Sequence, residues 1–195
     1  MPFIMTQDSS RPWPDVHLEL PIDTRLRNGK PWDEGDLPAC GKAVKPPRRW
    51  TDLIGIGGLW IISQRFAEFL RPYCPEELLM HKVDILSTPR NGPEERREYT
   101  LIKVIDRVAC IDLEQSGGRD QIEVRPNGDR WLSRPSWLPG KVYLRPGTFE
   151  HRHIWEPADM VPAFFVSDEL AESIRSNELT NIKLIKLSVA HQEAF

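Results

Sequence analysis

The stretch "FFVSDELAESIR", residues 164–175, decides the fold that we expect, because it joins an apolar strand to a short helix at a serine. An earlier stretch, "WIISQRFAEFLR", residues 60–71, is built in the same way. Identical residues align the two stretches: Ser63 with Ser167, Ala67 with Ala171, Glu68 with Glu172, and Arg71 with Arg175. The chain therefore contains two copies of one small structural pattern.

Both copies predict a helix that begins directly after its serine, since a serine hydroxyl can accept a hydrogen bond from a free amide of the first turn. The first helix should end near Arg71, because prolines follow closely. In the second copy, Asp168 and Glu169 place negative charge at the positive end of the helix. Alternating apolar stretches follow at 77–86 and 181–189, so both units are predicted to be strand, helix, strand.

Short candidate strands and turn residues fill the region between the two copies. The strands are "QIEV", "DRWLS", "KVYL" and "TFEHRHIW", and Asn127-Gly128 and Pro146-Gly147 supply the residues that tight reversals need. The pattern predicts an α+β fold, with a mostly antiparallel sheet and two short Ser-capped helices in repeated strand-helix-strand units.

Residues 1–50 are rich in proline, which fixes the backbone dihedral and removes a hydrogen-bond donor. Only "VHLEL" alternates like a strand, and Trp13, Trp32 and Trp50 lie beside or near prolines, where large rings can pin an irregular segment. We therefore predict a wrapping N-terminal segment at 1–50 and an α+β domain at 51–195.

Charge and composition exclude several functional classes. The chain has 26 basic and 29 acidic residues, a formal charge of −3, which argues against a dedicated nucleic-acid binder. Its most basic stretch, "KAVKPPRR", is interpreted as a solvated linker. The N-terminus lacks a signal-peptide pattern, no apolar run approaches a membrane span, and the three cysteines fit a reducing compartment. We expect a soluble cytoplasmic protein.

Candidate catalytic residues have ordinary structural explanations. Asp112 and Glu114 could lie on one side of a strand, but no basic partner is near them in the sequence. Ser63 and Ser167 lack the flanking glycines of a nucleophile elbow, so we interpret them as helix caps. Cys110 lies in an apolar stretch, where a buried thiol is the usual outcome. We expect neither a catalytic site nor a cofactor.

The histidines of "EHRHIWE" give an alternative. If this stretch is a strand, His151 and His153 point to one face and could bind a metal, with Glu156 or Asp159 as a further ligand. The spacing is common in proteins, and no further histidine or cysteine motif accompanies it. A metal-dependent hydrolase is kept as an alternative, but we predict no metal site.

Three stretches in order, "IISQRFAEFLR", "YTLIKVIDRVACIDLEQS" and "FFVSDELAESIRSNELTNIKL", resemble a family of bacterial immunity proteins from polymorphic-toxin and contact-dependent competition systems. The resemblance covers roughly residues 55–187. The matching positions are Ser63, Phe66 to Leu70, Tyr99, Asp112, Glu114, Ser116, Phe165 to Leu170, and Leu179.

The resemblance implies a cytoplasmic, non-catalytic protein that binds and neutralises a cognate toxin, which we expect to be encoded by an adjacent gene. The family supplies no binding residues. Rings and polar groups between turn signals favour a partner-binding region formed by Trp131, Trp137, His151, His153 and Trp155. A general protein-interaction module without a toxin partner is the remaining alternative.

Overall fold

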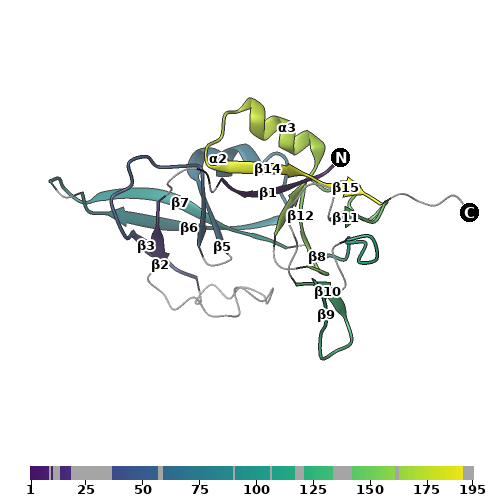
Figure 1. Cartoon of the computed structure of the whole chain (residues 1–195). Helices are drawn as coiled ribbons and strands as arrows, with labels where there is room; N and C mark the ends of the chain where they lie inside the picture. Colours follow the sequence, from purple (N-terminus) through teal and green to yellow (C-terminus); the bar gives the residue numbers. More distant parts are fainter. Residues whose placement is uncertain are drawn as a thin grey trace, which may run out of the picture. The chain divides into compact units, whose positions relative to one another are not determined.

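A computed structural model describes residues 1–8, 10, 14–18, 37–56, 59–89, 91–105, 107–116, 121–133, 142–160 and 163–190 (Figure 1). Contacts within the chain divide it into two compact units. The first unit contains Met1–Thr6, Val104–Glu178 and Lys183–Phe195. The second unit contains Gln7–Lys103 and Leu179–Ile182.

A six-stranded sheet, in the order β2-β3-β6-β7-β5-β4, organises the second unit. Its strands are β2 (Val16–Leu18), β3 (Cys40–Ala43), β4 (Leu53–Ile56), β5 (Leu59–Ser63), β6 (Leu78–Ser87) and β7 (Glu95–Val104). Leu53 pairs with Ile62, Ile54 pairs with Ile61, and all four side chains are fully buried. Consecutive buried residues mean that the β4–β5 hairpin is covered on both faces.

Helix α2 (Gln64–Leu70) follows β5 directly, as predicted. The Ser63 hydroxyl accepts a hydrogen bond from the amide of Phe66 at 3.2 Å, which confirms Ser63 as the N-cap. The helix ends at Arg71, also as predicted. It buries Phe66, Ala67 and Leu70, so its stability comes from packing an apolar face.

Side chains from distant residues cover the outer edge of β4. Gln7 accepts a hydrogen bond from the amide of Gly55 at 3.2 Å, and Asn181 donates to the carbonyl of Leu53 at 2.7 Å. A Cβ atom at position 55 would lie 2.9 Å from the Gln7 oxygen, so a larger residue there would require the Gln7 side chain to move. These bonds satisfy backbone groups that an exposed edge strand would offer to other chains.

A five-stranded sheet, in the order β14-β1-β13-β12-β8, organises the first unit. The strands are β1 (Phe3–Gln7), β8 (Arg107–Val108), β12 (Ile154–Pro157), β13 (Phe164–Val166) and β14 (Ile182–Lys186). Helix α3 (Asp168–Ser176) follows β13, and the Ser167 hydroxyl accepts from the amide of Leu170 at 3.1 Å. The predicted cap and acidic first turn are therefore present.

Two small sheets complete the first unit. The hairpin of β9 (Ile122–Val124) and β10 (Arg130–Leu132) turns at the predicted Asn-Gly pair, where Gly128 has a φ of 88°. Strand β11 (Tyr143–Leu144) pairs in parallel with β15 (Ser188–Val189). Residues 148–153, predicted to begin a strand, form turns instead, and the strand starts only at Ile154.

The predicted α+β fold of repeated strand-helix-strand units is wrong. The part of the chain that the structure describes is mostly β, with fifteen strands and two short helices. The strands that flank each helix are not neighbours, since β7 separates β5 from β6 and β1 separates β13 from β14. The sheets are also mixed, because β3 is parallel to β6 and β8 is parallel to β12. Strand partners come from distant parts of the chain, and a local pattern does not specify them.

The proposed boundary at residue 50 stays a prediction. Strands β1, β2 and β3 all come from residues 1–50, and they belong to the two large sheets. The tryptophans Trp13 and Trp32 lie outside the described residues. Among the helices that the structure describes, none has the length and apolar character needed to cross a bilayer.

Candidate functional site

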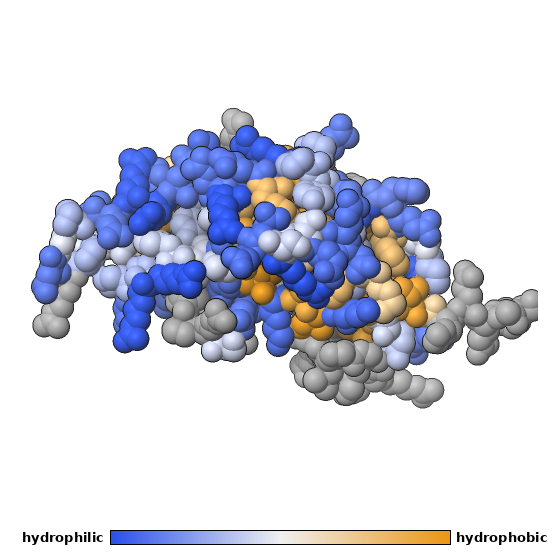
Figure 2. Space-filling view, turned by 90° about the horizontal axis from the view of Figure 1, so that it is seen from above, coloured by the Kyte–Doolittle hydropathy of each residue, from blue (hydrophilic) through white to orange (hydrophobic). Residues whose placement is uncertain are grey.

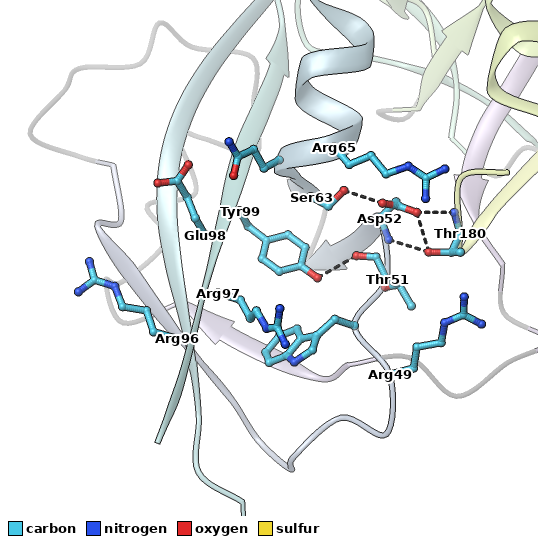
Figure 3. Close-up of a pocket in the computed structure, with 12 residues that line it drawn as sticks. Arg49, Thr51, Asp52, Ser63, Arg65, Arg96, Arg97, Glu98, Tyr99 and Thr180 are labelled. Atoms are coloured by element: carbon cyan, nitrogen blue, oxygen red, sulfur yellow. Dashed lines mark hydrogen bonds between the residues drawn. The ribbon is translucent and has the colours of Figure 1, made fainter. Parts of the chain in front are cut away.

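A cavity of about 420 Å³ opens on the second unit, and four arginines are among its lining residues: Arg49, Arg65, Arg96 and Arg97 (Figure 3). We call it the arginine cavity. Its other lining residues come from the segment before β4, the β5–α2 junction, β7 and Thr180. Four segments that are far apart in sequence therefore build one site.

Asp52 holds these segments together. Its carboxylate accepts hydrogen bonds from the Ser63 hydroxyl at 2.6 Å, the Thr180 amide at 2.7 Å and the Thr180 hydroxyl at 2.8 Å (Figure 3). The side chain is buried, with a residue exposure of 7%. These three hydrogen bonds hold the carboxylate in place at the junction of the segments that line the cavity.

Two aromatic rings form a wall of the cavity. The ring centroids of Trp50 and Tyr99 are 5.9 Å apart, and the Tyr99 hydroxyl donates to the carbonyl of Thr51 at 2.8 Å. Burial raises the pKa of Tyr99 well above its ordinary value, and the charge of Asp52 adds to this shift. Tyr99 therefore remains a neutral donor, and Trp50 packs against the core of the second unit.

The charges that line the arginine cavity are mainly positive. Four arginines face two carboxylates, those of Asp52 and Glu98. Glu98 pairs with Lys82 at 3.2 Å, so its charge is partly compensated outside the cavity. Arg96 pairs with Asp84, and its hydrogen bond holds the pKa of that carboxyl below the ordinary value. The cavity therefore presents a local positive charge in a chain whose formal charge is −3.

Two further arginines of the cavity, Arg97 and Arg49, differ in their contacts. The guanidinium of Arg97 lies 6.0 Å from the centroid of the Trp50 ring, within the range of a cation–π interaction. Arg49 is exposed. Neither side chain forms an ion pair with a carboxylate of the described residues. These two arginines are available to a negatively charged partner.

Sequence reasoning missed the arginine cavity. It interpreted Arg48 and Arg49 as part of a solvated linker, and it gave Arg96 and Arg97 no role. The available signal was an arginine pair beside an aromatic residue, present in "RRW" at 48–50 and in "RREY" at 96–99. The sequence alone cannot indicate that these two stretches meet, because β5 and β7 must first pair.

The predicted partner-binding residues differ in how far they are buried. Trp155 is fully buried, stacked on Phe149 at 5.6 Å and edge-on to Phe165 at 5.8 Å. Trp131 is half-buried beneath the guanidinium of Arg125, at 4.3 Å. Trp137 lies outside the described residues. The Trp155 ring therefore contacts this chain's own core, whereas Trp131 keeps one side accessible.

The two histidines do not share a strand face. His151 is exposed in a turn with a φ of 67°, and His153 is half-buried, with its Nδ1 atom 3.3 Å from the Ser167 hydroxyl. Asp159 is committed elsewhere, since it accepts from the amide of Ile111 at 2.9 Å and from Arg145 at 2.8 Å. Among the described residues, no three His, Cys, Asp or Glu side chains cluster in a way that could hold a metal. The premise of the hydrolase alternative, a histidine pair on one strand, is therefore absent.

The buried cysteines predict how stability changes with pH. Burial raises the pKa of the Cys110 thiol to about 12, with a contribution from the nearby charge of Asp159. Burial also raises the pKa of Cys74, next to Glu77. In the unfolded chain both thiols ionise near their ordinary pKa, about 8.5. The free energy of unfolding therefore keeps its full contribution from the neutral thiols below that pH and decreases above it. Each thiol should lower the free energy of unfolding by up to about 1.4 kcal/mol per pH unit as the pH rises toward 10.

Urea unfolding at pH 8, 9 and 10 tests this prediction. The variant Cys110→Ala should show a shallower pH dependence than the wild type, because it lacks one of the two ionising thiols. An identical slope in both proteins would show that Cys110 does not contribute.

The second unit thus combines a β-rich fold with a cavity lined by arginine and aromatic side chains, residue types that are enriched at protein interfaces. Comparison with protein-family models matches residues 22–189 to the immunity protein family (Imm11). The chain belongs to this family, which confirms the resemblance seen in the sequence and extends it into the N-terminal segment. A search of curated proteins found no match.

Proposed function

We propose that this chain is a non-catalytic immunity protein that binds a cognate bacterial toxin in the cytoplasm and neutralises it. Membership of the immunity protein family over residues 22–189 carries the proposal. The arginine cavity supports it, because arginine, tryptophan and tyrosine are the residue types that dominate binding energy at protein interfaces. The geometry favours neither of the two alternatives, a hydrolase or a general interaction module.

Co-expression with the product of the neighbouring gene tests the function. We expect that product alone to arrest growth, and we expect this protein to restore growth and to co-purify with it in a stable complex. A neighbour that is toxic but neither bound nor neutralised would contradict the proposal. A control expressing an unrelated immunity protein should leave the toxicity unchanged.

The region of Trp131 and His151 remains a second proposed contact region. Both residues lie at the surface of the first unit, with His151 exposed and Trp131 half-buried. Trp155 does not meet the same condition, since its ring is enclosed. Alanine at Trp131 and His151 should therefore be compared with the wild type in the same co-purification assay.

A further inference from the structure

The face of the molecule shown in Figure 2 is mostly hydrophilic, and its apolar side chains lie in smaller areas among polar ones. The exposed large hydrophobic residues of the described chain come from separate segments, such as Val44, Leu79, Ile105 and Val124. These exposed hydrophobic residues of the described chain therefore do not form one continuous segment of sequence. The arginine cavity, in contrast, combines charge and aromatic rings in one place.

We propose that the arginine cavity binds an acidic segment of the partner toxin, through Arg49 and Arg97 beside the Trp50 ring. This inference rests on the proposed immunity function and specifies its surface. Guanidinium groups form two parallel hydrogen bonds with a carboxylate, which gives both affinity and orientation. Aspartate and glutamate side chains are the complementary groups on a protein surface.

The pairing of charges around the cavity supports an anionic partner. The Asp52 carboxylate is saturated by Ser63 and Thr180, and the Glu98 carboxylate pairs with Lys82. Among the described residues, neither acid forms an ion pair with Arg49 or Arg97. A partner that brings carboxylates to this site would pair with these two guanidinium groups, and complementary charge also speeds association.

The spread of the arginines favours a protein segment over a single small anion. In Figure 3 the guanidinium groups of Arg49 and Arg97 lie at separate points of the cavity, and they do not converge on one position. A single phosphate would require donors that meet within hydrogen-bond distance of its oxygens. Separate donors suit several carboxylates along one segment.

The cavity is also preorganised for binding. Trp50 packs against the core, Tyr99 is held by its hydrogen bond to Thr51, and Asp52 fixes the junction of β5 and α2. A rigid wall reduces the conformational entropy that is lost when a partner docks. Arg97, held over Trp50, loses less side-chain freedom than an unrestrained arginine.

Charge reversal at the cavity tests the inference. The double variant Arg49→Glu/Arg97→Glu should bind the purified toxin about 100-fold more weakly than the wild type, and binding should become less sensitive to salt. The double variant Lys183→Glu/Lys186→Glu is the matched control, since it changes the charge equally at exposed positions of β14. We expect its affinity to stay within about threefold of the wild type.

The neutral variant Arg49→Gln/Arg97→Gln removes the two charges without reversing them, so it should disturb folding less. Its affinity for the toxin should fall about 10-fold. Calorimetry with the toxin measures affinity, and circular dichroism confirms that each variant is folded. Loss of binding in the cavity variants alone supports the inference. Unchanged binding in the cavity variants, or equal loss in the lysine control, overturns it while leaving the immunity function intact.

Two further outcomes are decisive. If the wild type does not bind the toxin at all, the immunity function fails, and this inference fails with it. If inorganic phosphate binds the wild type at the cavity without competing with the toxin, the site is a small-anion site and the inference is overturned. If phosphate competes with the toxin for the wild type, and this competition is lost in a folded Arg49→Gln/Arg97→Gln variant, the inference is supported.

Discussion

Replacing Trp155 with alanine is expected to lower the free energy of unfolding of the first unit by about 3–5 kcal/mol, the range for truncating a large buried aromatic side chain. The ring is fully buried between Phe149 and Phe165, so its removal leaves a cavity and deletes both ring contacts. For a chain of this size the loss corresponds to a decrease in melting temperature of roughly 10 °C. Thermal unfolding followed by circular dichroism measures it.

Trp131→Ala is the matched control for that variant. Its ring is half-buried and lies beneath Arg125, so truncation should cost only about 1 kcal/mol. Equal destabilisation by the two substitutions would contradict the packing described for Trp155. The pair also has a consequence for binding studies, because reduced toxin binding by Trp155→Ala must be corrected for its lower stability.

Replacing Asp52 with alanine is expected to lower the free energy of unfolding of the second unit by about 3 kcal/mol. The substitution leaves the Thr180 amide, the Thr180 hydroxyl and the Ser63 hydroxyl without their acceptor in a buried place. Hydrogen exchange at the Thr180 amide should become much faster, because its bond to Asp52 is the one that protects it. Urea unfolding and residue-resolved exchange measure the two effects.

Two other variants define the specificity of the Asp52 effect. Asp52→Asn keeps one acceptor oxygen for the Thr180 amide, and its new amide group can donate to the Ser63 hydroxyl, so it should cost about half as much. Asp129→Ala removes an exposed carboxylate of the β9–β10 turn and should change stability by less than about 0.5 kcal/mol. Slow exchange at Thr180 in Asp52→Ala would show that another group holds this amide.

Local sequence signals predicted local structure well. Ser63 and Ser167 are the N-caps that their hydroxyls indicated, and the strands after both helices are present at β6 and β14. The Asn127-Gly128 pair forms the expected hairpin turn. Such features depend on hydrogen bonds and dihedral preferences within a few residues, so the sequence contains the information that they need.

The same signals gave a wrong fold class, and they did not indicate the arginine cavity. The repeat of strand, serine and helix was interpreted as a repeated structural unit, but a third strand separates the flanking strands in each sheet. Trp155 was assigned to a binding surface because it lies among polar residues in the sequence. Its actual neighbours include Phe165, which the β12–β13 pairing places beside it.

By itself, the sequence determined the helix caps, the turns and the family to which the chain belongs, because these depend on residue types at short and fixed spacings. Only the tertiary structure decided which strands pair, which tryptophan is buried, and where the arginines meet. Asp52 and Thr180 lie 128 positions apart, yet three of the hydrogen bonds at the cavity join them. Contacts between residues so far apart in sequence depend on tertiary folding, and a local pattern of residues does not specify them.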